Sequence, residues 1–262
     1  MLAEERRSQL LELVRTRHFA TLPELGRELS VSASTIRRDL DHLEELGSVR
    51  RIHGGVLYAG ASPKVPHFEE SQPLRWNQKK AIARRTAAEI EESDTLLLDG
   101  GSTTYEVARL LVGRRLHVVT NSLPVANLFA SDPHSDLIFV GGNICPRTGV
   151  ARGPLADRML AAVRVRTTIL SVAGITEEGL FNNNLLLVET ERAMMQAADR
   201  VLVVADSSKF GRPSLAHLCP LEAADCLVVD EGLDEPWRER LEAAGIELLV
   251  APGAEKDTNG RP

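Results

Sequence analysis

Hydroxyl and arginine side chains gather in one short stretch near the start of the chain. Residues 32–38 read SASTIRR, and two further arginines and a histidine follow at Arg50, Arg51 and His53. Serine and threonine at the first turn of a helix suit phosphate oxygens, and arginine suits the paired acceptors of guanine. These residue types predict contacts with double-stranded DNA. The candidate contacts are Ser32, Ser34, Thr35, Arg37, Arg38, Arg50, Arg51 and His53.

A second set of polar residues follows apolar runs in the rest of the chain. The sequence DGGSTT (99–104) comes directly after the run TLLL, and TN, GG and DSSK follow later runs. Glycines let a backbone approach closely, and hydroxyls with helix-terminal amides can surround a phosphate. Such turns also cap helices in proteins without ligands, but four of them on one sheet edge predict a site for a polar, anionic small molecule. The candidate contacts are Asp99, Gly101, Ser102, Thr103, Thr104, Thr120, Asn121, Gly141, Gly142 and Lys209.

Three short helices and a hairpin are expected to position the first set. The spacing of apolar residues predicts a helix over 5–17, a second helix beginning at Thr21, and a third beginning after Ser32 and ending at Gly47. Thr21 and Glu24 form a capping box, and Ser32 is a good N-cap. Residues 48–58 alternate around Gly54-Gly55 and predict a two-stranded hairpin.

The third helix is expected to lie in a major groove. A helix, a short turn and a second amphipathic helix can place the N-terminal residues of the latter against base edges. Ile36, Leu40, Leu43 and Leu46 would then point inward, and the acidic residues of the helix would lie on the side away from DNA. The alternative is a small helical cap whose arginines are only solvated. The acidic residues are Asp39, Asp41, Glu44 and Glu45.

The second part of the chain alternates apolar runs with amphipathic segments. Near-continuous Val, Leu and Ile runs indicate strands buried on both faces, and helices between them indicate parallel crossovers. The fold class is therefore α/β, with a mostly parallel sheet of about seven strands. The expected helices include 79–90, 103–111 and 188–198. The expected strands are 95–100, 116–121, 136–142, 167–174, 200–207, 225–230 and 246–251.

Charge and composition divide the chain in the same place. Residues 1–60 hold nine basic and nine acidic residues, so the remaining 22 basic and 28 acidic residues carry the whole net charge of −6. Proline and glycine between 58 and 75 indicate a linker. We therefore expect a DNA-binding domain over 1–57, a linker over 58–75, an α/β domain over 76–252 and a disordered tail over 253–262.

Both parts resemble the DeoR family of bacterial transcriptional regulators. TIRRDL (35–40), LEELG (43–47) and RRIHGGV (50–56) match the family's winged helix-turn-helix almost residue for residue. LLLDGGSTTYEVARLL, HVVTNSLPVANLF and ADSSKFG match its sensor domain over about residues 75–232. That domain resembles ribose-5-phosphate isomerases in fold, and its usual effectors are phosphorylated sugars. The resemblance implies phosphate or polyol contacts at Asp99 and 101–104, with Lys209 lining the pocket.

The chain also departs from the family's pattern. The strand before Gly174 often carries an acidic residue and an aromatic, whereas RTTILSVAGI places Arg166 and Ile169 there, and Ser171 stands where glycine is common. Residues 181–185 form an unusually amide-rich loop. The identity of the effector can therefore be inferred from the family less directly than the DNA-binding role.

The alternative function is an enzyme, such as a sugar-phosphate isomerase or a CoA-linked transferase. Its general base would lie beside the substrate carbon, where Asp99 and Asp206 are candidates by position. No motif pairs either with a second proton-transfer residue, and a catalytic domain has no need of a DNA reader. The sequence also lacks GxGxxG and GxxxxGK[ST], and its three cysteines and seven histidines show no ligand spacing. We expect no enzyme, no cofactor and no metal.

These observations predict a cytoplasmic transcription regulator, a repressor of a carbohydrate-metabolism operon. The charged start, the absence of a long apolar run and the lack of CxxC spacing fit the cytoplasm and exclude a membrane span. The expected partners are a DNA operator and a phosphorylated sugar effector. One small DNA-binding domain contacts few base pairs, so we also expect a homo-oligomer, a dimer or tetramer. Its half-sites on the DNA would be separated by about one helical turn or by a multiple of one turn.

Overall fold

The computed structural model describes residues 6–7, 9–11, 13–14, 19–29, 31–45, 49–52, 55–58 and 75–253. The chain forms two compact units, residues 1–64 and residues 65–262. Several predicted features lie outside the described residues: Leu46, Gly47, His53, Gly54, residues 59–74 of the linker and the tail from residue 254. The boundaries of the four predicted segments remain predictions.

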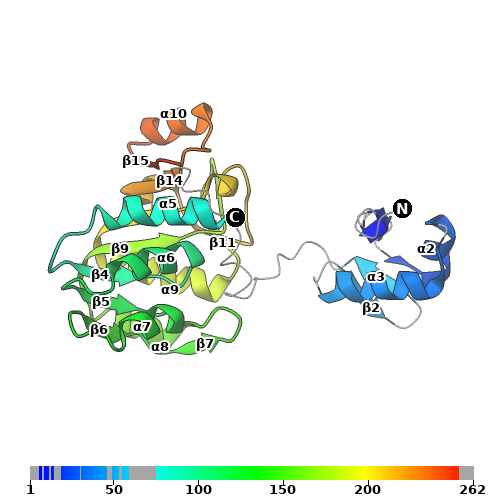
Figure 1. The fold of residues 1–262 in the computed structure, drawn as a ribbon, viewed down its shortest axis with the longest axis horizontal. Helices are drawn as coiled ribbons and strands as arrows, with labels where there is room; N and C mark the ends of the chain where they lie inside the picture. Colours follow the sequence, from blue (N-terminus) through cyan, green and yellow to red (C-terminus); the bar gives the residue numbers. More distant parts are fainter. Residues whose placement is uncertain are drawn as a thin grey trace, which may run out of the picture. The chain divides into compact units, whose positions relative to one another are not determined.

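The first unit combines helices with a small antiparallel sheet, as Figure 1 shows. Residues 6–7, 9–11 and 13–14 are helical, and α2 (Leu22–Glu28) and α3 (Ala33–Glu45) follow. The predicted hairpin is present as β2 (Val49–Ile52) and β3 (Gly55–Tyr58). A third strand, β1 (Phe19–Ala20), pairs with the outer side of β3 and was not predicted, because two residues leave no periodic pattern.

Capping residues and one apolar cluster hold this unit together. The backbone amide of Thr21 donates to Glu24 Oε2 across 2.8 Å, and that of Thr35 donates to Ser32 Oγ across 3.2 Å. Each bond satisfies an amide at the start of a helix that has no partner inside it. The buried cluster joins both helices to the sheet through Leu10, Val14, Ala20, Leu25, Leu29, Ile36, Leu40, Leu43, Val49 and Val56.

The second unit is built on a parallel sheet of seven strands. Each of the seven predicted strands lies in this sheet, so the predicted fold class is confirmed. Neighbouring strands run parallel throughout. In spatial order they are β15 (Glu247–Ala251), β14 (Cys226–Asp230), β12 (Ala198–Val204), β9 (Val165–Ser171), β4 (Thr95–Leu98), β5 (His117–Thr120) and β6 (Asp136–Phe139).

Helices cover both faces of the sheet, because alternate residues of each strand point to opposite sides. Leu96 and Leu98 pack in one core with α5 (Trp76–Ala87), α6 (Ser102–Leu111) and α7 (Leu123–Phe129), which lie side by side in Figure 1. Leu97 belongs to the other core, which includes α8 (Pro154–Leu160), α9 (Leu185–Gln196) and α10 (Glu235–Ala243).

Short strands and turns complete the rim of the second unit. After β6, the strand at one edge of the sheet, the chain forms a hairpin of β7 (Asn143–Cys145) and β8 (Val150–Arg152). A separate antiparallel sheet consists of β10 (Gly174–Thr176), β11 (Gly179–Asn182) and β13 (Ala216–Cys219), beside the 3-10 turns η1 (Ser207–Lys209) and η2 (Leu221–Ala223). Within the described part of the chain, no helix has the length and apolar character to cross a bilayer.

Candidate functional site

Helix α3 has one buried apolar face and one exposed polar face. Ile36 and Leu40 are fully buried, whereas Arg37 and Arg38 are exposed. The hydroxyl oxygen of Ser32 lies 2.9 Å from each of the hydroxyls of Ser34 and Thr35, so the three predicted hydroxyls form one group at the start of the helix. The structure therefore brings five of the predicted DNA contacts onto one helix end.

The other predicted DNA contacts belong to the hairpin. Arg50 and Arg51 lie on β2, opposite Leu57 and Val56 of β3. His53 lies outside the described residues. The hairpin is thus in place for a basic wing, and the contacts of these three residues remain predictions.

An ion-pair cluster on the buried side of α3 was not predicted. Asp39 is 2% exposed, and its carboxylate accepts hydrogen bonds from Arg6 Nε at 2.6 Å and from Arg7 Nε at 3.2 Å. Burial alone would raise the pKa of Asp39, but the hydrogen bonds from both arginines hold that pKa below its usual value. The available signal was spacing, since Asp39 lies three residues after Ile36 and four before Leu43, on the apolar stripe.

Asp99 anchors the loop between β4 and α6. It is 3% exposed, and its Oδ2 accepts a hydrogen bond from the hydroxyl of Ser171, at the end of the adjacent β9, across 3.2 Å. Burial raises the pKa of Asp99, although the backbone amides of Gly100, Ser171 and Gly101 donate to the carboxylate and oppose that change. The carboxylate is therefore already engaged by the chain's own amides and hydroxyl.

The two glycines after Asp99 allow close packing within the protein. A Cβ on Gly100 would lie 2.2 Å from Val150 Cγ2, and a Cβ on Gly101 would lie 1.7 Å from Ser171 Oγ. The chain's own side chains fill the space that we expected to favour a ligand's approach. A contact between the Gly101 backbone and an effector remains a prediction.

Buried polar atoms without partners lie at the ends of neighbouring strands. Asn121, after β5, donates from Nδ2 to the carbonyl of Ala151, but its Oδ1 has no hydrogen-bond partner among the described residues. The same holds for Oγ1 of Thr104, a fully buried residue on α6. Buried polar atoms are normally paired, so these two are candidates for hydrogen bonds to a ligand or water. Thr120 is different, because its hydroxyl donates to the carbonyl of Leu98.

Glu191 is a buried acidic residue near Asp99 that sequence reasoning missed. It is fully buried on α9 and accepts a hydrogen bond from Nδ2 of Asn182, which belongs to β11, while its Oε2 has no partner among the described residues. Burial and then the charge of Asp99 raise the pKa of Glu191 well above its usual range, against the hydrogen bond from Asn182. The signal was again spacing, since Glu191 lies three residues from both Val188 and Met194 on the buried stripe.

A basic group surrounds Asp206 at the end of β12. Lys209, on η1, is half-buried and close enough to Lys79 of α5 for the two charges to interact. Burial lowers the pKa of Lys79 to about 8; Lys209 adds to that change and Asp206 opposes it. Arg75 Nε lies 3.6 Å from Asp206 Oδ1. Lys79 begins the predicted helix 79–90 but was not predicted as a contact, although it is the first buried residue of α5.

The remaining predicted residues lie at the edges of this arrangement. Ser102 and Thr103 begin α6, with Thr103 buried and Ser102 half-buried. Gly141 and Gly142 lie between β6 and β7, where a Cβ on Gly142 would lie 3.2 Å from Ala156 Cβ of α8. Gly142 therefore lies beside α8, whereas a Cβ on Gly141 would have no atom within 4 Å.

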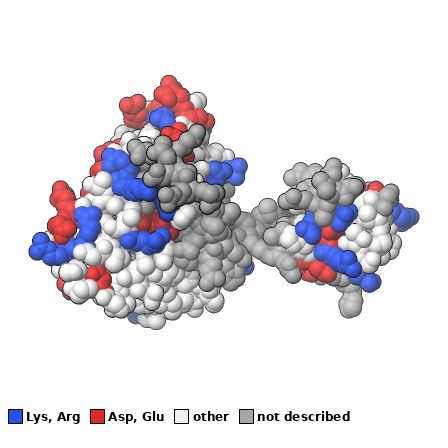
Figure 2. Space-filling view, viewed as in Figure 1, with Lys and Arg blue, Asp and Glu red and all other residues white. Residues whose placement is uncertain are grey.

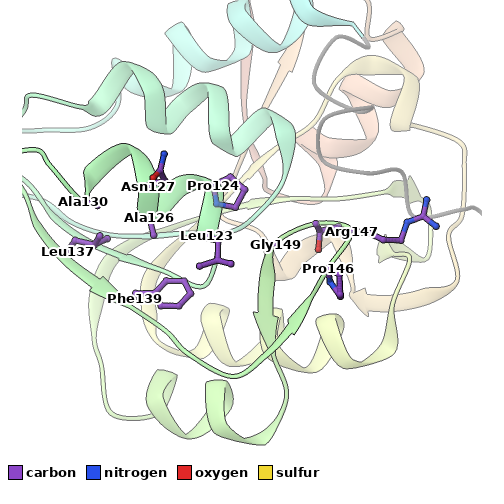
Figure 3. Close-up of a pocket in the computed structure, with 11 residues that line it drawn as sticks. Leu123, Pro124, Ala126, Asn127, Ala130, Leu137, Phe139, Pro146, Arg147 and Gly149 are labelled. Carbon is purple, nitrogen blue, oxygen red and sulfur yellow. The ribbon is translucent and has the colours of Figure 1, made fainter.

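A pocket of about 720 Å³ lies elsewhere, between α7, β6 and the turn that joins β7 to β8. Figure 3 shows its lining, which is largely apolar. None of the predicted effector contacts is among the lining residues, which are Leu123, Pro124, Ala126, Asn127, Ala130, Leu137, Phe139, Pro146, Arg147, Thr148 and Gly149.

Known protein families match both units. Residues 6–61 match the DeoR-like helix-turn-helix domain, and residues 75–231 match the DeoR C terminal sensor domain. The chain belongs to the DeoR family of transcriptional regulators. The predicted family is thus confirmed, and with it the presence of a DNA-binding domain and a sensor domain.

Relatives in the DeoR family align along most of the chain. An uncharacterized HTH-type transcriptional regulator of Bacillus subtilis is 31% identical over 253 residues, 96% of this chain and 98% of the relative. The glycerol-3-phosphate regulon repressor of Escherichia coli is 32% identical and covers 86% of this chain and 90% of its own length. The transcriptional repressor AccR of Agrobacterium fabrum is 34% identical, with 87% and 90% covered. These relatives are regulators, so the prediction of a regulator in place of an enzyme is confirmed.

The solved structures that match are distant in sequence and in fold. Ribose 5-phosphate isomerase A of Methanocaldococcus jannaschii covers 50% of this chain and 53% of its own, with 15% identity and a TM-score of 0.38. That match is too distant to bear on the function of this DeoR-family regulator. Which residues contact DNA or an effector remains a prediction.

Proposed function

We propose that this DeoR-family regulator represses a carbohydrate operon and that a phosphorylated sugar bound to its second unit controls its binding to DNA. The observation that carries the DNA-binding part is the exposed pair Arg37 and Arg38 on α3, opposite the buried Ile36 and Leu40. The names of two relatives support the operon type, since one is the glycerol-3-phosphate regulon repressor and another a putative aga operon repressor, both of Escherichia coli.

The N-terminal end of α3 enters the major groove in this proposal. Arg37 and Arg38 then reach base edges, where an arginine can donate hydrogen bonds to both acceptors of a guanine. The three hydroxyls of Ser32, Ser34 and Thr35 lie against phosphates. The hairpin with Arg50, Arg51 and His53 follows the neighbouring backbone or minor groove. One such unit contacts few base pairs, so the regulator binds as a homo-oligomer.

The effector binds at the carboxyl ends of the strands. The unpaired Thr104 Oγ1 and Asn121 Oδ1 offer hydrogen bonds to it, and Lys209 with Lys79 supplies positive charge for a phosphate. A ligand shifts the regulator between DNA-competent and incompetent states only if it binds one of them more tightly. For the effector to release DNA, it must bind the DNA-incompetent state more tightly. The effector site is therefore better formed in that state.

Arg37→Ala tests the DNA-binding part. Loss of a bidentate base contact costs about 1–3 kcal/mol of operator binding, which is roughly a 5- to 150-fold weaker Kd. The measurement is a mobility-shift titration against promoter fragments of the source organism at low ionic strength. Arg84→Ala, an exposed arginine of α5, is the matched control and leaves the affinity unchanged. Equal affinity of the Arg37 variant and the wild type would contradict the proposal.

A further inference from the structure

Two buried carboxylates lie close enough at the end of the sheet for their charges to interact. Asp99 directly follows β4 and is 3% exposed, and Glu191 of α9 is fully buried. Helices α6 and α9 cover opposite faces of the sheet, but both contact β9, the strand beside β4. Acidic side chains of α10, by contrast, are exposed and gather in red at the top of the larger unit in Figure 2. Water stabilises such surface charges, whereas a buried carboxylate needs a partner.

One oxygen of Glu191 has no hydrogen bond to accept. Nδ2 of Asn182 donates to Glu191 Oε1 across 2.6 Å, whereas Oε2 is buried without a partner among the described residues. Burial and the charge of Asp99 raise the pKa of Glu191 well above its usual range, so both favour the protonated form. A buried polar atom without a partner is uncommon in folded proteins, and this one belongs to a side chain beside a second buried carboxylate.

A second unpartnered atom belongs to Thr104 of α6. Its Oγ1 is buried without a partner among the described residues, and it lies 3.8 Å from the place that a Cβ on Gly101 would occupy. The same Cβ would lie 1.7 Å from Ser171 Oγ, which donates to Asp99 Oδ2 across 3.2 Å. The hydroxyl of Thr104 is therefore close to the group that holds Asp99. We call the following residues the Asp99–Glu191 cluster: Asp99, Thr104, Ser171, Asn182 and Glu191.

Among the described residues, no positive charge is paired with either carboxylate of the cluster. Asp99 accepts hydrogen bonds from backbone amides and from Ser171, and Glu191 accepts one from Asn182. A metal ion is not favoured as the missing cation, because no group of three or more His, Cys, Asp or Glu side chains in the described part of the chain is placed to hold one. An ammonium group is a better match, since it is a cation that donates three hydrogen bonds.

We propose that the Asp99–Glu191 cluster binds an ammonium group of the effector, which is then a phosphorylated amino sugar. This inference rests on the proposed function, which assigns the phosphate of the same molecule to Lys79 and Lys209. These lysines lie near Asp206, which follows β12, and β9 separates β12 from β4 in the sheet. A ligand that crosses the end of β9 has its anionic end near the lysines and its cationic end near the carboxylates. A hydroxyl in place of the ammonium would leave the buried negative charge unbalanced.

Binding of an ammonium group also changes the protonation of Glu191. A nearby positive charge favours the carboxylate over the neutral carboxyl, so the proton of Glu191 passes to the buffer when the ammonium binds. A neutral hydroxyl causes no such change. Proton release on binding is therefore a readout that a purely structural role of Glu191 would not produce.

The test is isothermal titration calorimetry of the full-length protein with glucosamine 6-phosphate, glucose 6-phosphate and N-acetylglucosamine 6-phosphate. All three probes carry the phosphate, and only the first carries an ammonium group. We expect glucosamine 6-phosphate to bind at least about tenfold more tightly than the other two, because hydrogen bonds to charged groups are stronger than those between neutral groups. Titrations at pH 7 in buffers of different ionisation enthalpy are expected to show additional proton release for glucosamine 6-phosphate alone.

Glu191→Gln and Glu189→Gln are the matched variants for this test. Glutamine at position 191 keeps the oxygen that accepts from Asn182 but cannot balance a cation, so it removes the preference for the amine and the additional proton release. Glu189 is exposed and pairs with Arg192, so Glu189→Gln keeps both.

Two results would overturn this inference and leave the proposed function standing. One is equal affinity of the wild type for all three probes, and the other is a preference for the amine that survives Glu191→Gln. If none of the three sugar phosphates binds, the proposed function fails and this inference fails with it.

Discussion

Asn182 Nδ2 donates a hydrogen bond to Glu191 Oε1 across 2.6 Å, where both side chains are buried. The charge of Asp99 acts on the same glutamate and, with burial, raises the pKa of Glu191 well above its usual range. Two carboxylates that are both removed from water are costly to ionise together. Burial and the charge of Asp99 therefore both favour the protonated form of Glu191 in the folded chain.

Glu191→Gln is expected to stabilise the second unit at neutral pH. An acid whose pKa is higher in the folded state gives a stability that is fully present below its unfolded pKa and is lost as pH rises through the folded pKa. Glutamine keeps the oxygen that accepts from Asn182 and cannot ionise. We expect a gain on the order of 1 kcal/mol at pH 7, or about 2–4 °C in Tm, and no gain near pH 4, measured by thermal unfolding.

The control for that variant is Glu189→Gln on the same helix. Glu189 is exposed and pairs with Arg192 at 2.7 Å, so its neutralisation leaves stability nearly unchanged at both pH values. An equal gain at pH 4 and pH 7 for Glu191→Gln would show that ionisation is not the cause.

Gly101→Ala is expected to destabilise the second unit by overpacking. The added Cβ would meet Ser171 Oγ at 1.7 Å and Ser171 Cβ at 2.6 Å, and overfilled sites cost about 1–3 kcal/mol. Ser171→Gly removes both atoms, so the double variant recovers part of the loss made by the alanine. Urea unfolding of the two single variants and the double variant measures this coupling, and strict additivity would refute it.

The inner strands of the sheet could be predicted from the sequence because they are largely buried on both faces. Runs such as Leu96–Leu98 and Val201–Val204 are continuous and apolar for that reason. Strands β7, β8, β10, β11 and β13 have three or four residues each at the rim, too few to show a period. Spacing could have placed Glu191 and Lys79 on the buried stripes of their helices, but it could not have identified the residues that they contact. Asn182 and Asp206 come from other segments, which only the tertiary packing brings close.

Asp39→Asn is expected to lower the stability of the first unit. The hydrogen bonds from Arg6 and Arg7 outweigh burial and depress the pKa of Asp39 in the folded state. A carboxyl group with a depressed folded pKa gives stability that is present above its unfolded pKa, about 4, and is lost as pH falls through the folded value.

The urea midpoint of the wild type therefore falls on acidification below about pH 4, and that of Asp39→Asn is lower at pH 7 and falls less. Circular dichroism of the full chain at a wavelength dominated by helix follows the transition. Asp41→Asn, on the exposed side of α3, is the control; interactions of exposed charges contribute little to stability, so this variant keeps nearly the wild-type pH dependence. If the urea midpoints of all three proteins changed with pH in the same way, Asp39 would not be the cause of the acid dependence.

Anion binding beside Lys79 should depend on pH. Burial, with Lys209 adding and Asp206 opposing, lowers the pKa of Lys79 to about 8, so the ammonium that attracts an anion is present at pH 7 and largely absent at pH 9. Sulfate is the probe, because its charge does not change in this range. An anion that binds only the folded state raises its stability by RT ln(1 + [L]/Kd), so we expect sulfate to raise Tm more at pH 7 than at pH 9.

In Lys79→Met the rise in Tm with sulfate is small at both pH values. Lys80→Met is the matched control, since the Lys80 ammonium lies 3.4 Å from the centre of the Trp76 ring, and it keeps the wild-type response. A sulfate effect of equal size at both pH values, or one that survives Lys79→Met, would place the anion elsewhere.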